Sequence, residues 1–279
     1  MLLELHTHTH HSLGEKVHYD GISKPEAMVR RASRLGIGAL NISDHDTQKG
    51  LAEARKAGKK YGVLIIPGEE ISSKQGHIVA VGISEAIPPG MDYRETIDRI
   101  HEMGGAAIAS HPFDITKHGL HERAKKCDAV ESFSAINLDR FSNRTCRAFA
   151  KKHGLHQVAG SDAHCPEMLG HGVNWTDAEG IDGIVKAIRG GRTEISIARY
   201  QPMSNILSWN VGKLQMSYDQ VLSYVNDNYG WFRRAAGTNL LKLVNHSPGK
   251  VDWLIKFFGY TGLAVAFGVG AKQFVGNKF

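Results

Sequence analysis

The chain has 279 residues, of which 42% are hydrophobic and 22% charged, a composition typical of soluble globular proteins. This length accommodates one α/β domain with an appendage. The three cysteines, Cys127, Cys146 and Cys165, form no CxxC pair, and no basic segment followed by an apolar one stands at the N-terminus. These features argue against a disulfide-based fold and a secretory signal, so we expect a cytoplasmic protein.

The net charge of +6 is unevenly distributed along the chain. From Gln201 onward there are eight basic and three acidic residues, so this tail carries five of the six net positive charges. Only one of the 16 histidines, His246, lies in the tail. We therefore expect a histidine-rich body over residues 1–198 and a basic, helical C-terminal extension over residues 199–279, with different tasks.

The body alternates short apolar runs with segments of helical periodicity. Ser23-Lys24-Pro25-Glu26 has the pattern of a capping box and predicts the start of a helix that Gly36 ends. Such alternation predicts a largely parallel sheet with helices outside it, either a barrel or an open doubly wound sheet. The expected strands are 2–5, 39–42, 63–66, 78–81, 106–109, 130–133 and 157–159, and the other expected helices of the body are 51–61, 93–103 and 144–152.

Potential metal ligands follow one expected strand after another. His6 and His8 come after the first strand, and residues two apart on an extended chain face the same side. Asp162 and His164 repeat this spacing after a later strand. Because the carboxyl ends of barrel strands meet at one rim, we expect a shared metal site there, and imidazoles with a carboxylate are typical of catalytic metal sites. The further strand-end candidates are His45, Glu70 and His111.

With these motifs the sequence resembles the PHP (polymerase and histidinol phosphatase) superfamily over about residues 1–195. The resemblance implies an α/β fold, namely a distorted (β/α)7 barrel with a C-terminal helical extension. It also implies a metal-dependent phosphoesterase with two or three divalent ions, which could be zinc, manganese or iron. The matching stretches are His6-Thr-His8, Tyr-Asp20-Gly, Ser-Asp-His45-Asp-Thr, Pro-Gly-Glu-Glu70-Ile-Ser, Gly-His77-Ile, Ala-Ser-His111-Pro and Gly-Ser-Asp162-Ala-His164.

The resemblance assigns nine side chains to the metals. Of two adjacent glutamates, Glu70 fits the family's Gly-x-Glu pattern and would bridge two ions, whereas Glu69 would only be a neighbour. Glu70 and Asp162 would also hold the metal-bound water that attacks phosphorus. The assignments are His6, His8, Glu70 and Asp162 for the first metal, Glu70, His77 and His111 for the second, and Asp20, His45 and His164 for the third.

The sequence departs from the family pattern between His8 and Asp20, where the link is longer than usual. Asp20 is preferred as a ligand because Asp20-Gly21 leads directly into the expected helix, as in the family. The rivals for its place are His10, His11 and His18. Candidates for contacting the phosphate or the leaving group are Arg140 and His171, for which ordinary surface or loop positions are the alternative.

Phosphate esters suit such a site because several divalent cations attract phosphoryl oxygens. We expect nucleotides or nucleic-acid 5′ ends as substrates, as in an exonuclease, and the excess basic charge also favours a polyanion. One alternative is a small-molecule phosphatase of the histidinol-phosphate type. Another is a non-catalytic, metal-stabilised scaffold, against which the complete ligand set argues.

The segment Trp253–Ala271 is strongly apolar and lies between Lys250 and Lys272. As a helix its uninterrupted part, residues 257–271, would span about 22 Å, which is short against a hydrocarbon core of ~30 Å. Two interpretations remain open: a helix packed on the body or on a partner chain, and a membrane-associated anchor favoured by the flanking aromatic residues and lysines. Upstream, residues 217–231 predict an amphipathic helix.

Overall fold

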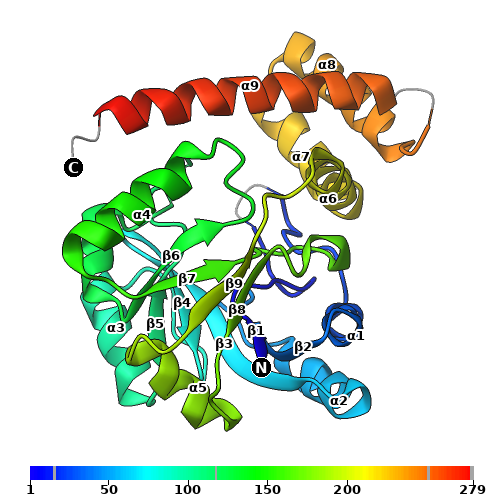
Figure 1. The fold of residues 1–279 in the computed structure, drawn as a ribbon. Helices are drawn as coiled ribbons and strands as arrows, with labels where there is room; N and C mark the ends of the chain where they lie inside the picture. Colours follow the sequence, from blue (N-terminus) through cyan, green and yellow to red (C-terminus); the bar gives the residue numbers. More distant parts are fainter. Residues whose placement is uncertain (15–16, 117, 250–251, 277–279) are drawn as a thin grey trace.

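A curved sheet of nine strands forms the body of the chain in a computed structural model that describes residues 1–14, 17–116, 118–249 and 252–276. The sheet has the strand order β7-β6-β5-β4-β3-β2-β1-β8-β9 and curls into a nearly closed barrel (Figure 1), which confirms the expected fold. The strands are β1 (Leu2–Glu4), β2 (Ile37–Ile42), β3 (Leu64–Ser73), β4 (Gly76–Val81), β5 (Ala106–Ala109), β6 (Ala129–Ser134), β7 (Gln157–Gly160), β8 (Gly172–Trp175) and β9 (Glu194–Ala198).

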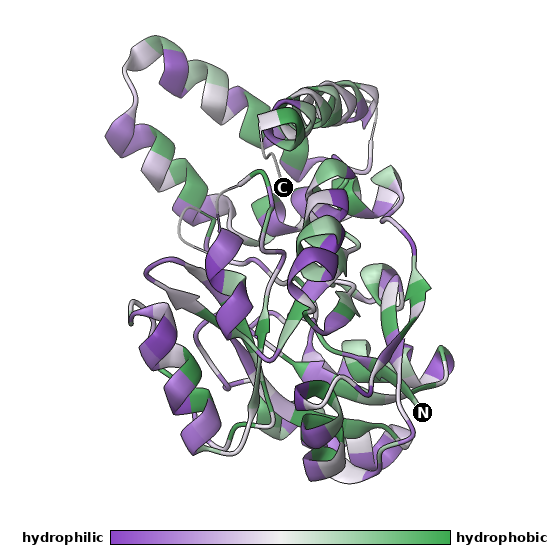
Figure 2. Ribbon diagram, turned by 60° about the vertical axis from the view of Figure 1, so that its left-hand side comes forward, coloured by the Kyte–Doolittle hydropathy of each residue, from purple (hydrophilic) through white to green (hydrophobic). Residues whose placement is uncertain are grey.

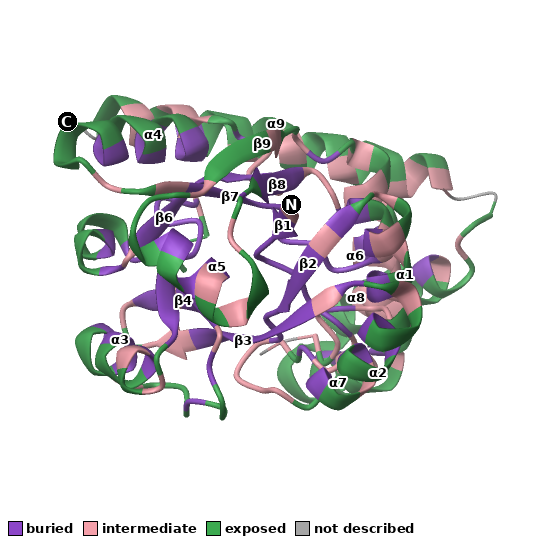
Figure 3. Ribbon diagram, turned by 60° about the horizontal axis from the view of Figure 1, so that its bottom comes forward, coloured by how far each residue is buried: buried purple, intermediate pink, exposed green. Residues whose placement is uncertain are grey.

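Helices cover the outside and one end of the barrel. The helix α5 lies across the end that faces the viewer in Figure 3, where its residues Ile184 and Ile188 pack with buried strand residues such as Leu3 and Ile108. Burial of these apolar side chains closes that end, so a site can open only at the other end. The helices of the body are α1 (Pro25–Arg34), α2 (Leu51–Tyr61), α3 (Tyr93–Glu102), α4 (Phe141–His153) and α5 (Gly180–Arg189).

The sheet is mixed, and the expectation of a largely parallel sheet was wrong. Only Lys74 and Gln75 join β3 to β4, which is too short a link for a crossover helix, so β4 runs antiparallel to both β3 and β5. Strand β8 is likewise antiparallel to β1 and to β9. The β3–β4 hairpin pairs His77 with Ser72 and so brings His77 to the edge where β3 ends.

A side chain completes the barrel between β7 and β8. The Oδ1 atom of Asn174 accepts a hydrogen bond from the N–H of Ala159 at 2.9 Å, and its Nδ2 donates to the carbonyl of Ala159 at 2.8 Å. A Cβ on Gly172 would lie 2.2 Å from the carbonyl oxygen of Gly160, so only glycine permits this approach of the two strands. The Asn174 amide thus replaces a pair of ladder hydrogen bonds.

The expected capping box at Ser23 does not form. The helix α1 begins at Pro25 with Lys24 as its N-cap, and no side chain caps it. Proline at the first helical position has no N–H, so one donor fewer needs a partner there. The Glu26 carboxylate instead accepts a hydrogen bond from Lys60 Nζ at 2.9 Å, which ties α1 to the end of α2.

In the described part of the C-terminal extension four helices form, and they lie over one side of the barrel (Figure 1). The expected helix over residues 217–231 is interrupted at Tyr229-Gly230, so it divides into α7 and the first residue of α8. The helices are α6 (Met203–Met216), α7 (Tyr218–Asn228), α8 (Trp231–Asn245) and α9 (Asp252–Gly276).

The helix α9 packs along α4 and α6. The rings of Phe267 and Phe141 lie 4.9 Å apart, and a Cβ on Gly259 would lie 2.3 Å from Leu207 of α6. Much of α9 nevertheless stays exposed, and the helices that rise above the barrel carry many hydrophobic residues (Figure 2). Among the described helices, α9 alone has the length and mean hydropathy (1.5) of a membrane span, and only 6% of its apolar window is buried.

Candidate metal centre

The nine side chains expected to bind metals come together at one rim of the barrel. Strand ends deliver most of them, the β3–β4 hairpin delivers Glu70 and His77, and the loop before α1 delivers Asp20. Ligand atoms lie within 4.8 Å of one another in five overlapping groups of three, and within the described part of the chain these groups contain the nine residues and no others. The groups are His6, His8 and Glu70; His6, His111 and Asp162; His8, Asp162 and His164; His8, Asp20 and His45; and His45, Glu70 and His77.

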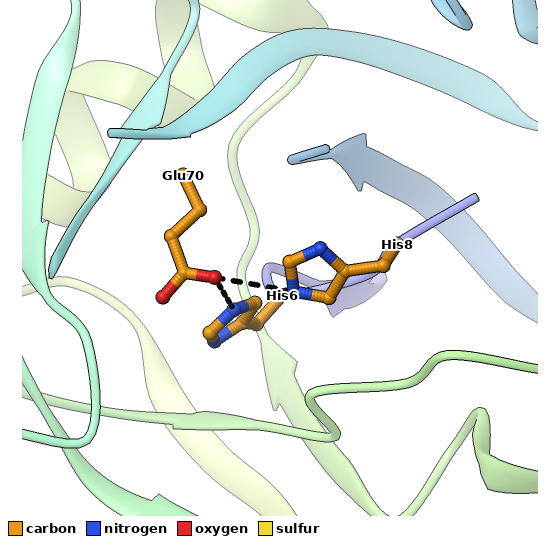
Figure 4. A group of neighbouring side chains, drawn as sticks. All are labelled: His6, His8 and Glu70. Atoms are coloured by element: carbon orange, nitrogen blue, oxygen red, sulfur yellow. Dashed lines mark hydrogen bonds and ion pairs between the residues drawn. The ribbon is translucent and has the colours of Figure 1, made fainter. Parts of the chain in front are cut away.

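The carboxylate of Glu70 lies at the centre of this cluster. Both its oxygens are buried, and five imidazoles approach them. Figure 4 shows two of these rings, His6 and His8, converging on the same oxygen. The Oε2 atom lies 3.1 Å from His6 Nε2, 3.2 Å from His8 Nε2 and 3.4 Å from His45 Nε2, and Oε1 lies 3.2 Å from His111 Nε2 and 3.3 Å from His77 Nδ1.

Two aspartates complete the cluster on either side of Glu70. The Oδ1 atom of Asp162 lies 3.2 Å from His8 Nε2 and 3.5 Å from His6 Nε2, so Asp162 and Glu70 share these two rings. The Oδ2 atom of Asp20 accepts a hydrogen bond from His164 Nε2 at 2.6 Å. The longer link after His8 therefore still brings Asp20 to the rim.

The three histidines considered as rivals of Asp20 lie outside the ligand groups. The rings of His10 and His11 lie against each other at a tilt, with centroids 4.2 Å apart, and the ring of His18 packs edge-on against Tyr19 at 4.8 Å. None of the three belongs to a group of possible metal ligands among the described residues. The geometry thus favours Asp20.

Charges of opposite sign hold the cluster together. Burial alone would lower the pKa of the histidines, but the Asp162 and Glu70 carboxylates raise the pKa of His8 to about 9. Burial would likewise raise the pKa of Glu70, yet the surrounding imidazoles, His6 foremost, hold it well below its usual range. For His45 burial dominates and lowers the pKa to about 3. The carboxylates are therefore ionised, and His45 is a neutral donor.

A further carboxylate, Glu131 of β6, orients two of the expected ligands. Its Oε2 atom lies 3.1 Å from His6 Nδ1 and accepts the backbone N–H of His111 at 3.0 Å. A carboxylate on the second ring nitrogen fixes the tautomer and the orientation of a ligating histidine. Glu131 was not among the residues predicted from the sequence. It could have been noticed as the one charged residue in the buried strand Ala129–Ser134.

The backbone at the rim is held in sparsely populated conformations. His111 and Asp162 have positive φ angles of 28° and 47°, a region that side-chain-bearing residues seldom adopt. Holding a residue in such a conformation lowers the stability of the fold by about 1–3 kcal/mol, and residues of this kind cluster at functional sites. The hydrogen bond from the His111 N–H to Glu131 helps to hold this turn.

A large cavity opens in front of the cluster. It has a volume of about 1230 Å³ and is lined by Asp20, His45, Glu70, His77, His111, Asp162 and His164 on one side and by α6, α8 and α9 on the other. Lys213 of α6, which the sequence reasoning missed, lines the cavity with its Nζ 3.7 Å from Asp20 Oδ1. The two predicted substrate contacts do not line it. Arg140 is exposed and stacks on Tyr200, and His171 bonds through its backbone N–H to Ser161 Oγ.

Divalent metal ions suit this cluster. Without a metal, the histidines balance the carboxylates only by carrying protons, and divalent ions would displace these protons when they bind. Among the described residues, the ring nitrogens His8 Nε2 and His77 Nδ1 have no hydrogen-bond partner of good geometry, although both point at carboxylate oxygens. A cation between such nitrogens and oxygens would satisfy both, and zinc, manganese and iron accept this donor set.

The comparisons with known families agree with this geometry. The PHP domain model matches residues 4–161, and a PHP-associated model matches residues 140–193. The chain belongs to the PHP family. An uncharacterised protein of Methanocaldococcus jannaschii is 36% identical over 149 residues, which are 51% of this chain and 87% of that protein.

Relatives with named activities match this PHP chain over shorter stretches. A 5′-3′ exoribonuclease of Salmonella typhimurium is 35% identical over 39% of this chain and 37% of its own length. A phosphoribosyl 1,2-cyclic phosphate 1,2-diphosphodiesterase of Eggerthella lenta is 31% identical over 32% of this chain and 33% of its own length. Family membership, together with these relatives, identifies the chain as a metal-dependent phosphoesterase.

Solved structures share the fold of this PHP chain. A two-domain protein of Bacteroides vulgatus, described as containing a PHP-like metal-dependent phosphoesterase, has a TM-score of 0.59 with 18% identity over 75% of this chain and 68% of that one. PsfC from Pseudomonas syringae has a TM-score of 0.54 with 16% identity over 77% of this chain and 98% of its own. At these identities the likeness concerns the barrel fold alone.

Proposed function

We propose that the chain hydrolyses phosphate esters at a centre of two or three divalent metal ions held by the nine clustered side chains. The observation that carries this proposal is the approach of five imidazoles to the two oxygens of Glu70. Because imidazole nitrogens lie near each of the two oxygens, Glu70 is placed to bind one ion through each oxygen and so to bridge them. Divalent ions at such a centre neutralise phosphoryl oxygens and lower the pKa of water, which supplies the nucleophile.

The residues of the chain have distinct tasks in this proposal. Glu70 and Asp162 would hold the ions together with the water that these ions activate. Glu131 keeps His6 oriented through its Nδ1, and Ser12 Oγ does so for His8 at 3.0 Å. Lys213 faces the cavity beside Asp20, where its ammonium group could meet a phosphoryl oxygen as the ester bond breaks.

Nucleotides and nucleic-acid 5′ ends are one candidate substrate class. The exoribonuclease relative and the phosphoribosyl diesterase relative support this class, since both names describe phosphate esters of ribose. A small phosphate monoester of the histidinol-phosphate type is the alternative. Both classes present a phosphate that the cluster could receive, and they differ in the group that must fit the rest of the cavity.

Removing the metal should abolish hydrolysis without unfolding the barrel. The reason is that the buried core clusters of the barrel do not depend on the rim for their packing. The purified chain would be treated with a chelator, and reloaded in turn with zinc, manganese and iron. Activity would be measured on nucleotides, 5′-phosphorylated oligonucleotides and amino-alcohol phosphates, with circular dichroism as the control for folding. Undiminished hydrolysis in the metal-free chain would contradict the proposal.

The C-terminal extension, residues 199–279, is proposed to be a separate unit whose last helix packs on the body. Deleting residues 250–279 should lower the Tm or cause aggregation, because loss of α9 exposes Phe141 and the apolar side chains of α6. Thermal unfolding and light scattering would measure this. An unchanged Tm, combined with transfer of the protein from the membrane fraction to the soluble fraction, would assign α9 to a membrane instead.

A further inference from the structure

The cavity in front of the metal cluster has two chemically different halves. One half consists of the expected ligands and polar neighbours such as Ser72, Asn137 and His118. The other half is an apolar wall that the C-terminal extension provides. The wall is formed by Ile206, Leu207 and Leu214 of α6 and by Phe258, Leu263 and Ala266 of α9.

The size of the cavity exceeds what a phosphate group needs. Its volume of about 1230 Å³ is above the range of roughly 300–1,000 Å³ that is usual for sites of whole organic ligands. A phosphate at Glu70 would occupy only the polar end. The remaining space, along α6 and α9, is therefore available to the group that the phosphate esterifies.

The charges along the cavity do not suit a nucleic-acid strand. The extension contributes one of the two lysines among the described lining residues, Lys213, and the other, Lys74, lies on the β3–β4 turn. No arginine lines the described part of the cavity. A bound strand would need cationic side chains along its phosphates. The apolar wall offers none, so the positive charge of the extension does not mark a path for a polyanion in this cavity.

Two glycines of α9 shape this wall in different ways. At Gly262, which lines the cavity, an added Cβ would meet no atom within 4 Å. Gly259 allows α9 to lie directly on Leu207, so the wall is continuous from α6 to α9. Exposure of apolar surface to water is unfavourable by about 25 cal/mol of free energy per Å², and a hydrocarbon chain that lies on the wall would bury this surface.

We infer that the substrate is an amphiphilic phosphate ester, whose phosphate binds at the metal cluster and whose hydrocarbon chain lies against α6 and α9. This inference rests on the proposed phosphoesterase function and names the substrate class for the same site. Lys213 marks the boundary between the two halves, since its Nζ lies 3.7 Å from Asp20 Oδ1 and 4.1 Å from the centroid of the Trp209 ring.

Binding of alkyl phosphonates, whose carbon–phosphorus bond resists hydrolysis, tests the inference directly. The metal-loaded full-length chain would be titrated calorimetrically with phosphonates from ethyl to dodecyl, each below its micelle concentration. The Kd should fall roughly three- to fourfold for each methylene that enters the cavity, until the wall is covered. A Kd that does not change with chain length would overturn the inference, and so would tighter binding of a nucleoside 5′-phosphonate than of dodecylphosphonate.

A matched pair of glycine substitutions locates the chain-binding wall. Gly262→Leu fills the open space in the cavity and should weaken dodecylphosphonate binding at least ~10-fold, with ethylphosphonate unaffected. Gly268→Leu is the control, because Gly268 lies on the same helix, also has no atom within 4 Å of an added Cβ, and does not line the cavity. Both changes raise helix propensity equally. Equal effects of the two variants would overturn the inference.

Failure of this inference can be told apart from failure of the proposed function. If the metal-loaded chain hydrolyses p-nitrophenyl phosphate but binds all alkyl phosphonates alike, only the amphiphilic substrate is excluded. If it hydrolyses no phosphate ester, whether short, long or nucleotide, the proposed function itself is wrong.

Discussion

Replacing His6 and His8 together by alanine should lower phosphate-ester hydrolysis at least ~100-fold, the scale expected when a metal-activated nucleophile is lost. Both rings contact the carboxylates of Glu70 and Asp162, so the double substitution removes two donors from the centre of the cluster. Initial rates on a phosphate ester that the native chain hydrolyses, measured at saturating metal, would quantify the loss. A cooperative thermal unfolding transition should remain, because the apolar core is untouched.

The neighbouring pair His10 and His11 provides the matched control. These rings lie against each other and belong to none of the ligand groups among the described residues. Alanine at both positions should therefore leave the rate within a few-fold of the native chain. Full activity of the His6→Ala, His8→Ala variant would refute the assignment of the site. An equal loss in the His10→Ala, His11→Ala variant would show that these histidines take part as well.

Glu70→Gln should remove more than one metal ion per chain and reduce hydrolysis by at least ~100-fold. Glutamine keeps the shape of the side chain but removes the negative charge that two cations would share. Asp162 also contacts His6 and His8, but among the described ion pairs only Glu70 reaches His77 as well. Metal content would be measured by mass spectrometry after loading and desalting, alongside the rate.

Glu69→Gln is the control for this change. Glu69 points away from the cluster, and its Oε2 accepts the backbone N–H of Ile87 at 2.8 Å, a hydrogen bond that a glutamine oxygen can also accept. Metal content and rate should therefore change little. A loss in Glu69→Gln that exceeds the loss in Glu70→Gln would show that the two adjacent glutamates have been assigned in the wrong order.

The grouping of seven of the nine expected ligands could be predicted because it depends on local rules, whereas Asp20 and His77 were indicated only by the family motifs. A period of two along an extended chain puts His6 and His8 on the same side. The same spacing predicted the grouping of Asp162 and His164, although Asp162 follows the end of β7 and has a positive φ angle of 47°. Strand ends of a barrel meet at one rim, so residues that follow different strands must lie close together. His77 reached the rim by a different route, through the β3–β4 hairpin, and there only the family motif indicated its place.

The expectations that failed depended on competing local interactions. The pattern Ser23-Lys24-Pro25-Glu26 is that of a capping box, yet Pro25 took the first helical position and Glu26 found Lys60 of another helix. The parallel sheet was inferred from alternation, although the two-residue link between β3 and β4 allowed only an antiparallel pair. The proline in the first case and the short link in the second restrict the backbone more strongly than the sequence pattern from which the expectation was drawn.

The sequence by itself determined which side chains could bind metals and that strand ends would gather them, because both follow from residue type and backbone period. Only the tertiary structure decided which imidazoles share each oxygen of Glu70, that Glu131 holds His6, and that α9 covers the cavity. These arrangements join residues far apart in the chain, as when the absence of a side chain at Gly259 lets α9 rest on Leu207. Such contacts arise from packing between elements, and packing complementarity leaves no periodic signal in either segment alone.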